Sequence, residues 1–388
     1  MKDKILILAA DLEQVLPIAK SLYDKGFEIH GIFSSKLSYG YGSRYIKRKY
    51  IHQNAVEIED YYLFIKSVLQ KERYVSIIPM RDSAAEVMCK YRDDLLQYTA
   101  YVMPDADGFE RGFDKQRLME VCKMHGYPHP ETYIVRNGSL CGLDIVEIRY
   151  PVLIKPNHTF GARGMTLCRN KDELEKKYPI IFNQFGECHL QTYIPEGGHQ
   201  VEVQIYINEK QELVQSSVIK KFRWYPNKGG SSCCNISCKN EKIVDICYKV
   251  LKSIGWVGFA DFDTIEDPRT GELLIMEINP RVPACVKSAF ASGIDWADVI
   301  VGEYLKKSHK VYQMNREVYL RFLGVEVLWF LKSENKWHTK PNWFNFFGKD
   351  IFYQDMSDWT DPMPFIRGTI GNIKKQLSPE FRKSKAGV

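Results

Sequence analysis

Two strand-like runs flank a short turn in the segment Val257-Gly-Phe-Ala-Asp-Phe-Asp-Thr-Ile-Glu-Asp-Pro-Arg-Thr-Gly-Glu-Leu-Leu-Ile-Met-Glu-Ile-Asn-Pro-Arg281. The turn, Asp267-Pro-Arg-Thr-Gly271, has residues typical of hairpin connections. Because strand side chains alternate between two faces, a hairpin would bring Asp263 opposite Glu277 and Asn279. Two carboxylates and an amide oxygen suit a Mg²⁺ ion that carries nucleotide phosphates. The alternative is a solvated acidic sheet face, and the Glu-x-Asn pattern by itself favours that alternative.

A second motif places a lysine at the end of an apolar strand. The segment Tyr150-Pro-Val-Leu-Ile-Lys-Pro156 puts Lys155 just before the loop His158-Thr-Phe-Gly-Ala-Arg-Gly-Met165. Glycines there would let backbone amides close over phosphates, and the lysine would supply a fixed cation. The loop lacks the Gly-Lys-Ser/Thr ending of a P-loop, and its glycines do not lead into a helix as in a dinucleotide fingerprint. A surface hairpin with an exposed lysine is the alternative.

The rest of the chain divides by its pattern of strands and helices. The first hundred residues alternate apolar strands with helical stretches, which predicts a parallel, doubly wound sheet whose strand ends, such as Pro79-Met-Arg-Asp82, hold ligands. A helix is expected from Lys115 to Gly126, with a domain boundary near residue 110. Residues 150–280 are rich in strands and predict an α+β region with antiparallel sheet. The last 80 residues are rich in aromatic side chains, which we expect to pack onto the remainder.

Composition bounds the class of protein. A chain of 388 residues with 45% hydrophobic and 26% charged residues can build two or three packed domains. The net charge of +6 is small and dispersed, so nucleic acid is not an expected partner. No apolar run approaches the roughly twenty residues that cross a bilayer, so no transmembrane segment is expected. The 10 cysteines form no Cys-x-x-Cys pair, which is typical of reduced thiols and predicts a cytoplasmic protein.

The order of these motifs resembles the ATP-grasp superfamily, particularly its stand-alone carboxylate-amine ligases, from about residue 1 to residue 305. The resemblance implies an α/β plus α+β chain with a Rossmann-like domain in residues 1–110. Two ATP-grasp lobes would follow in residues 111–188 and 189–310, and the aromatic-rich residues 311–388 would form a C-terminal extension.

The resemblance also implies residues that contact ATP. Lys115, in Asp114-Lys115, and Lys155 would reach the phosphates, and Gly161 to Gly164 would form the mobile phosphate loop. The hinge between the lobes would lie in Leu190-Gln-Thr-Tyr-Ile-Pro195, whose backbone meets the adenine edge through Gln191, Thr192, Tyr193 and Ile194. Two positions depart from the family, since Thr192 replaces a glutamate and Gln200 stands where a carboxylate usually holds the ribose. These departures leave the nucleotide preference open.

The same resemblance assigns a metal site and two arginines. Asp263, Glu277 and Asn279 match the ligands of Mg²⁺, with Mn²⁺ as an alternative ion. Arg281 resembles a cation near the transferred phosphoryl group or the substrate. Arg223 and the following Gly229-Gly-Ser-Ser232 resemble a phosphate-contacting arginine and a second glycine-serine loop. Lys220 and Lys221 could belong to the site or could be solvated, and both alternatives remain open. His158 could orient the substrate or could have no role in the site.

The implied reaction is the activation of a small carboxylate as an acyl phosphate and its transfer to an amine substrate, with Lys155, Arg223 and Arg281 stabilising charge. A carboxylase or carbamoyl-phosphate-forming enzyme would use bicarbonate on the same fold. A non-catalytic ATP-binding module is the third reading, although the metal ligands that such a module would lose are present. A nicotinamide dehydrogenase is disfavoured because no Gly-x-Gly-x-x-Gly turn follows Ala9. A homodimer is left open.

Overall fold

The computed structural model describes residues 2–53, 57–141, 143, 147–158, 163–225, 231–356 and 358–377. Its strands are β1 (Lys4–Leu8), β2 (Glu28–Phe33), β3 (Ile46–Ile51), β4 (Ser76–Pro79), β5 (Thr132–Tyr133), β6 (Val152–Pro156), β7 (Thr166–Cys168), β8 (Cys188–Thr192), β9 (Gln200–Ile207), β10 (Leu213–Tyr225), β11 (Ser231–Cys238), β12 (Gly258–Glu266), β13 (Leu273–Asn279), β14 (Tyr319–Arg321) and β15 (Ile351–Tyr353). Its helices are α1 (Val15–Asp24), α2 (Tyr39–Gly42), α3 (Ile58–Lys71), α4 (Asp82–Lys90), α5 (Arg92–Leu95), α6 (Ala106–Phe113), α7 (Lys115–His125), α8 (Lys171–Phe185), α9 (Glu241–Ser253), α10 (Lys287–Ala291), α11 (Trp296–Tyr304), α12 (Leu323–Lys332) and α13 (Met363–Leu377), with a 3₁₀ turn at Ala284–Val286.

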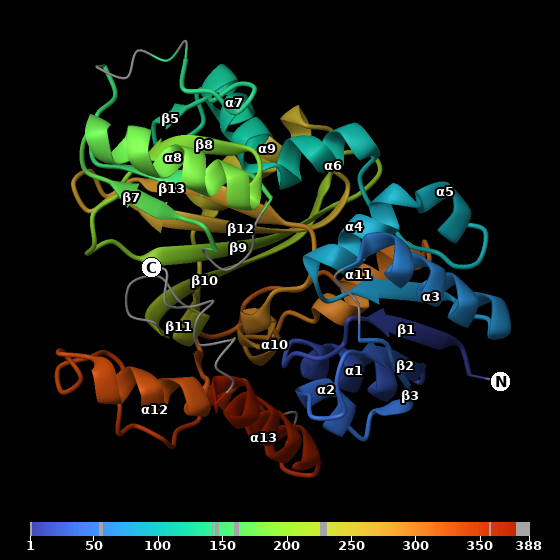
Figure 1. The fold of residues 1–388 in the computed structure, drawn as a ribbon. Helices are drawn as coiled ribbons and strands as arrows, with labels where there is room; N and C mark the ends of the chain where they lie inside the picture. Colours follow the sequence, from blue (N-terminus) through green and yellow to red (C-terminus); the bar gives the residue numbers. More distant parts are fainter. Residues whose placement is uncertain are drawn as a thin grey trace.

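The N-terminal region is a parallel sheet in the order β3-β2-β1-β4, as its alternating strands and helices predict (Figure 1). In β1, Ile5 to Leu8 are fully buried, because a parallel sheet packed by helices exposes neither face to water. The carboxyl end of β4 runs directly into α4, which begins at Asp82. This end of the sheet faces the remainder of the chain and contributes to the candidate site.

Two further sheets follow, as the α+β pattern predicts. The smaller one is antiparallel in the order β5-β8-β6-β7 and packs α8 over a core that includes Ile154, Leu174 and Leu190. The larger one has the order β13-β12-β9-β10-β11-β14-β15. All its pairings are antiparallel except that of β14 with β15. In Figure 1 the lobe holding β7, β8 and α8 lies with β9, β12 and β13 in the upper part of the molecule.

The aromatic-rich C-terminal region adds its own strands to the larger sheet through β14 and β15. Its rings also form a cluster around Phe330, whose centroid lies 4.3 Å from that of Trp343 and 5.3 Å from that of Trp337. The expected packing of this region on the remainder is therefore confirmed. The expected domain boundaries, including the one at residue 310, stay predictions. Among the described residues, no helix has the combined length and apolarity that crossing a bilayer requires.

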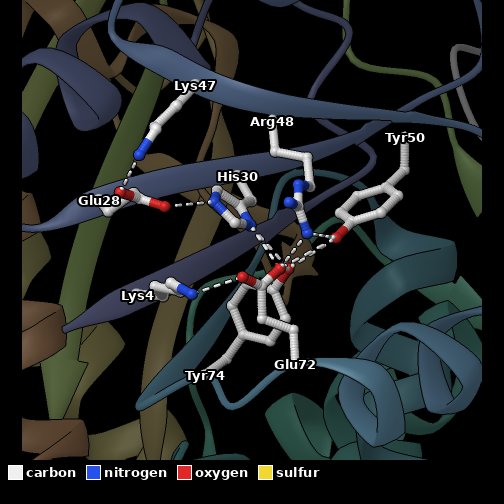
Figure 2. Close-up of polar contacts among 8 residues, drawn as sticks. All are labelled: Lys4, Glu28, His30, Lys47, Arg48, Tyr50, Glu72 and Tyr74. Atoms are coloured by element: carbon white, nitrogen blue, oxygen red, sulfur yellow. Dashed lines mark hydrogen bonds and ion pairs between the residues drawn. The ribbon is translucent and has the colours of Figure 1, made fainter. Parts of the chain in front are cut away.

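The amino-terminal ends of the parallel strands hold a compact polar cluster, which Figure 2 shows. Asp82 follows the opposite, carboxyl end of β4. The buried His30 lies at its centre, with Nδ1 2.7 Å from the Tyr74 hydroxyl and Nε2 3.0 Å from Glu28 Oε1. Glu72 accepts hydrogen bonds from Lys4 and Arg48. The strands of the sheet begin near this cluster, so its ion pairs join β1, β2, β3 and the segment before β4 to one another.

Candidate active site

The hairpin of β12 and β13 brings the predicted metal ligands together. Asp263 pairs across the hairpin with Glu277, and Asp261 pairs with Asn279, in the register that strand alternation predicts. The Asn279 amide nitrogen donates to Asp263 Oδ2 at 3.2 Å. This contact fixes the amide group and leaves its carbonyl oxygen as the ligand atom. The donor set is therefore two carboxylates and an amide oxygen on one sheet face, which fits a hard divalent cation.

Two lysines from distant parts of the sequence meet these carboxylates. Lys115, at the first position of α7, places Nζ 3.4 Å from Glu277 Oε2. Lys155, on β6, is 4% exposed and donates from Nζ to Gln191 Oε1 at 2.9 Å. Burial lowers the pKa of Lys155 to about 8, against the opposing charges of Glu277 and Asp263. The structure thus brings both predicted phosphate-binding lysines to the hairpin that carries the predicted metal ligands.

A third lysine, Lys221 on β10, completes the cluster. Its Nζ lies 2.7 Å from Asp263 Oδ1 and 3.2 Å from Glu202 Oε2, and its side chain is only 12% exposed. Burial opposes its charge, but Asp263 and Glu202 raise the pKa of Lys221 well above its ordinary value. The solvated alternative is therefore wrong for Lys221. Its neighbour Lys220 must point to the opposite face of β10, because side chains alternate along a strand. This alternation is the only feature of the sequence that assigns the two lysines to different faces.

The Lys221 ion pair also sets the charge of its partner. Burial alone would raise the pKa of Asp263, but Lys221 outweighs it and holds that pKa below its ordinary value. Asp263 is therefore an anion, the form that a metal ligand needs. Glu202 was not among the residues expected in the site. It lies on β9 opposite Asp263 in β12. Its place in the site therefore depends on which strands are neighbours in the sheet.

Arg281 joins the hairpin to the N-terminal sheet. Its Nη1 lies 3.1 Å from Asp261 Oδ2, and its Nε lies 3.3 Å from Asp82 Oδ1 at the start of α4. Burial and the neighbouring Glu202 raise the pKa of Asp261 well above its ordinary value. The other oxygen of Asp261, Oδ1, is buried without a hydrogen-bond partner among the described residues. Arg281 therefore lies between the carboxyl ends of the strands of the parallel sheet and the carboxylates of the larger sheet.

The predicted hinge connects the smaller sheet to the larger one. β8 ends at Thr192, whose N–H donates to Glu131 O at 2.8 Å, and the Tyr193 N–H donates to Pro151 O at 3.0 Å. Gln191 is buried against Lys155, as described above, and Ile194 follows directly. Gln200 begins β9 between Lys221 and Ile265 of the adjoining strands. These backbone contacts fix the hinge against the lobe that carries Lys155.

A cavity of about 340 Å³ lies against this hinge. Its lining includes Thr192, Tyr193, Ile194, Pro151 and Leu274. Lys155, Asp263 and Glu277 are outside that lining, so the cavity and the charged cluster occupy different parts of the junction between the lobes.

The start of the predicted phosphate loop is tied to the helix that carries Lys115. His158 Nε2 lies 2.9 Å from Asp114 Oδ2, and this contact raises the pKa of His158. Asp114 also caps α7 by accepting the Arg117 N–H at 2.9 Å. At the other end of the loop, Gly164 has a positive φ of 75°, a conformation that favours glycine. Gly161 lies outside the described residues.

Arg223 points away from the charged cluster. Its guanidinium pairs with Glu326 of α12 at 2.6 Å and donates to Thr339 and to the Pro341 carbonyl. Arg321 pairs with the same carboxylate, so Glu326 is buried between two arginines. The structure does not bring Arg223 to Asp263, and its predicted contact with phosphate gains no support from these partners. Gly229 and Gly230 lie outside the described residues.

Residues 114–305 match the family described as carbamoyl-phosphate synthase L chain, ATP binding domain. This region is an ATP-grasp domain. A D-aspartate ligase from Enterococcus faecium is 26% identical over 243 residues, which cover 56% of this chain and 58% of that protein. The chain spans between 22% and 46% of the length of three further curated relatives, two carbamoyl phosphate synthase large chains and a 2-oxoglutarate carboxylase small subunit.

Solved structures show the same fold. The biotin carboxylase domain dimer of the 2-oxoglutarate carboxylase from Hydrogenobacter thermophilus, in complex with MgADP, ADP and bicarbonate, matches with a TM-score of 0.67 and 20% identity, covering 82% of this chain and 74% of that chain. An L-amino acid ligase from Bacillus licheniformis matches with a TM-score of 0.63 and 12% identity, covering 82% of this chain and 79% of that chain. An N-terminal parallel sheet followed by ATP-grasp sheets is thus a known arrangement.

Proposed function

We propose that this protein is a Mg-ATP-dependent ligase that couples a carboxylate to an amine and produces an amide, ADP and phosphate. The observation that carries the proposal is the convergence of Lys115, Lys155, Asp263, Glu277 and Asn279, which four separate segments of the chain deliver to one junction. Phosphoryl transfer needs positioned charges more than a protein nucleophile, and this cluster supplies both signs of charge.

The residues fit a nucleotide with its metal ion. Asp263, Glu277 and Asn279 would hold Mg²⁺ or Mn²⁺, which supplies charge neutralisation between phosphate oxygens. Lys115 now pairs with Glu277, and it would exchange this carboxylate for phosphate oxygens. Lys155 keeps its position through Gln191 and would neutralise a second phosphate. The same strand faces carry apolar side chains two residues away, Leu153 beside Lys155 and Ile265 beside Asp263, and both are half-buried, which suits the flat faces of a base.

The reaction that follows has two steps. A carboxylate oxygen of the acid attacks the γ-phosphorus, and the bond to ADP breaks. The amine nitrogen then attacks the acyl carbon, the carbon–oxygen bond breaks, and phosphate leaves while the amine gives up a proton. Arg281 is the cation that we assign to the reacting carboxylate, because it lies between the hairpin and the strand ends of the first sheet. Arg223 is not assigned a step.

The amine as acceptor is supported by the D-aspartate ligase, a relative at 26% identity, and the bicarbonate alternative by the carboxylase whose structure contains bicarbonate. Because both use one fold, the fold does not decide between them. A homodimer is also a proposal, supported by the dimeric form of that carboxylase domain. ATP as the preferred nucleotide stays a proposal as well, since Thr192 and Gln200 occupy the hinge and ribose positions.

The test is a phosphate-release screen of carboxylates against amines with Mg-ATP, followed by isotope transfer with the working pair. Carboxylate labelled with ¹⁸O must deliver label to phosphate, since the bridging oxygen leaves with phosphorus. Glu277→Gln should abolish release, whereas Glu272→Gln on the exposed turn of the same hairpin should not. Label that comes only from bicarbonate would establish the alternative. Amide formation without labelled phosphate, or full activity of Glu277→Gln, would overturn the acyl-phosphate proposal.

A further inference from the structure

The helix α13 presents an apolar stripe to solvent. Its exposed side chains recur at intervals of three and four residues, which places them on one face of a helix. They are 40%, 45%, 43%, 55% and 63% exposed, in the order Met363, Ile366, Ile370, Ile373 and Leu377. Single exposed apolar residues are common, but a continuous stripe along four turns marks an interaction surface.

The opposite face of α13 is already used. Gly368 and Gly371 lie so close to the N-terminal region that an added Cβ would come within 2.2 Å of the Tyr39 ring and 2.0 Å of the Leu37 carbonyl. Asn372 donates to the Tyr39 hydroxyl at 2.9 Å. Figure 1 shows α13 beside α2 at the flank of the molecule, away from the β12–β13 hairpin. The glycine face therefore fixes the helix, and the apolar stripe is directed outward by this packing.

The charges of α13 are of one sign. Between Met363 and Leu377 the charged residues are Arg367, Lys374 and Lys375, and no acidic residue occurs there. The sequence beyond the helix adds Phe381-Arg-Lys-Ser-Lys385, which lies outside the described residues. Just before the helix, Trp359 is 84% exposed. An apolar stripe bordered by lysine and arginine, with an exposed tryptophan in the segment before the helix, is the pattern of helices that lie in the surface of a negatively charged membrane.

We propose that α13 docks this protein on an anionic lipid surface, with its apolar stripe among the acyl chains and its basic residues at the headgroups. Charge complementarity selects this occupant over a second copy of the chain. Pairing two α13 helices through the stripe would bring the positive charges of the two helices together, with no acidic residue of either helix to offset them. Phosphate headgroups supply that missing negative charge.

The experiment is co-sedimentation of the full chain with two kinds of vesicle. One contains phosphatidylcholine alone, and the other contains phosphatidylcholine and phosphatidylglycerol at a ratio of about two to one. The wild-type chain should pellet with the anionic vesicles, and its binding to them should weaken as the salt concentration rises. Ile370→Glu/Ile373→Glu should lower the bound fraction by about tenfold. Lys374→Gln/Lys375→Gln should lower affinity by about fivefold per lysine removed. Leu63→Glu, on α3, is the matched control because Leu63 is 56% exposed, and it should bind like wild type.

Circular dichroism of each variant checks its fold, and the lysine variant keeps the test valid if the double glutamate variant unfolds. Absence of binding to anionic vesicles, or equal binding by all variants, would overturn the proposal. Light scattering without lipid examines the second-copy alternative. A dimer that Ile370→Glu/Ile373→Glu dissociates would also overturn it, since the stripe would then be occupied by another copy of α13.

Discussion

Lys155 holds its ammonium group in a site that is 4% exposed, beside Gln191 and in the field of Glu277. Such a buried cation is retained where an anion is to be bound, because burial alone disfavours its charge. Lys220 offers a comparison, since it is half-buried on β10 and its strand position directs it to the face opposite Lys221.

Lys155→Met should weaken nucleotide binding by about ten- to a hundredfold, the loss of a charge-assisted hydrogen bond of roughly 1.5–3 kcal/mol. Lys220→Met should change it little, because Lys220 does not belong to the cluster. Titration of both purified variants with a fluorescent ATP analogue measures the difference. Equal small effects in the two variants would remove Lys155 from the proposed site.

Residues differ in how far their place could be inferred from the sequence. The pairing of Asp263 with Glu277 follows from alternation in a hairpin whose turn residues are evident, and the register confirms it. Alternation fails on β10, because its pairing with β11 shifts register on both sides of Arg223. The face of Arg223 could therefore not be counted along the strand, and its partner Glu326 is far away in sequence. Lys221 lies just before that irregularity. Alternation places Lys220 and Lys221 on opposite faces, but nothing in the local sequence shows which of the two faces the site.

At the scale of elements, the strands and helices of the first region and α7 were predictable, since periodicity and capping residues mark them. Asp114 caps α7, and Gly126 ends it with a positive φ of 70°. The C-terminal strands were not, because β14 and β15 contain three residues each and owe their existence to the edge of the larger sheet. A short edge strand is specified by its neighbour more than by its own sequence.

The helix α12 is fastened to that sheet by a buried carboxylate. Glu326 is 0% exposed and pairs with Arg223 on β10 and Arg321 on β14, which are 2% and 0% exposed. Glu326→Gln should lower the free energy of unfolding by roughly 3–5 kcal/mol, since two arginines then lie buried without a counter-charge. Chemical denaturation measures it, with Glu334→Gln at an exposed position as the control. A loss no larger than that of the control would show that Arg223 and Arg321 are stabilised by other groups.

At the scale of the whole molecule, the two ends of the parallel sheet have different roles. Its carboxyl end reaches the candidate site through Asp82 and Arg281. Its amino end is closed by the cluster of His30, Glu28 and Glu72 shown in Figure 2. The separation predicts that stability and catalysis respond to different substitutions within one sheet.

Glu72 should make the stability of this sheet depend on pH. Burial favours its protonated form, but the hydrogen bond from Lys4 and the charges of His30 and Arg48 lower the pKa of Glu72 to about 2. Its contribution is therefore complete above its ordinary value of about 4.5 and is lost as pH falls towards 2. Burial also lowers the pKa of His30, so the unfolded chain takes up a proton below about pH 6.5 before the folded chain does. Both effects reduce stability on acidification.

Glu72→Gln should accordingly lower the thermal unfolding midpoint most at neutral pH, and the gap to wild type should narrow as pH falls below about 4.5. Differential scanning fluorimetry across pH measures both curves. Glu175→Gln, which removes an exposed partner of Lys171 on α8, should leave the midpoint unchanged, because surface ion pairs contribute little. Nucleotide affinity of Glu72→Gln should match wild type, since the cluster lies at the end of the sheet opposite Asp82. A gap that stays constant down to pH 2 would mean that Glu72 acts through its shape and not through its charge.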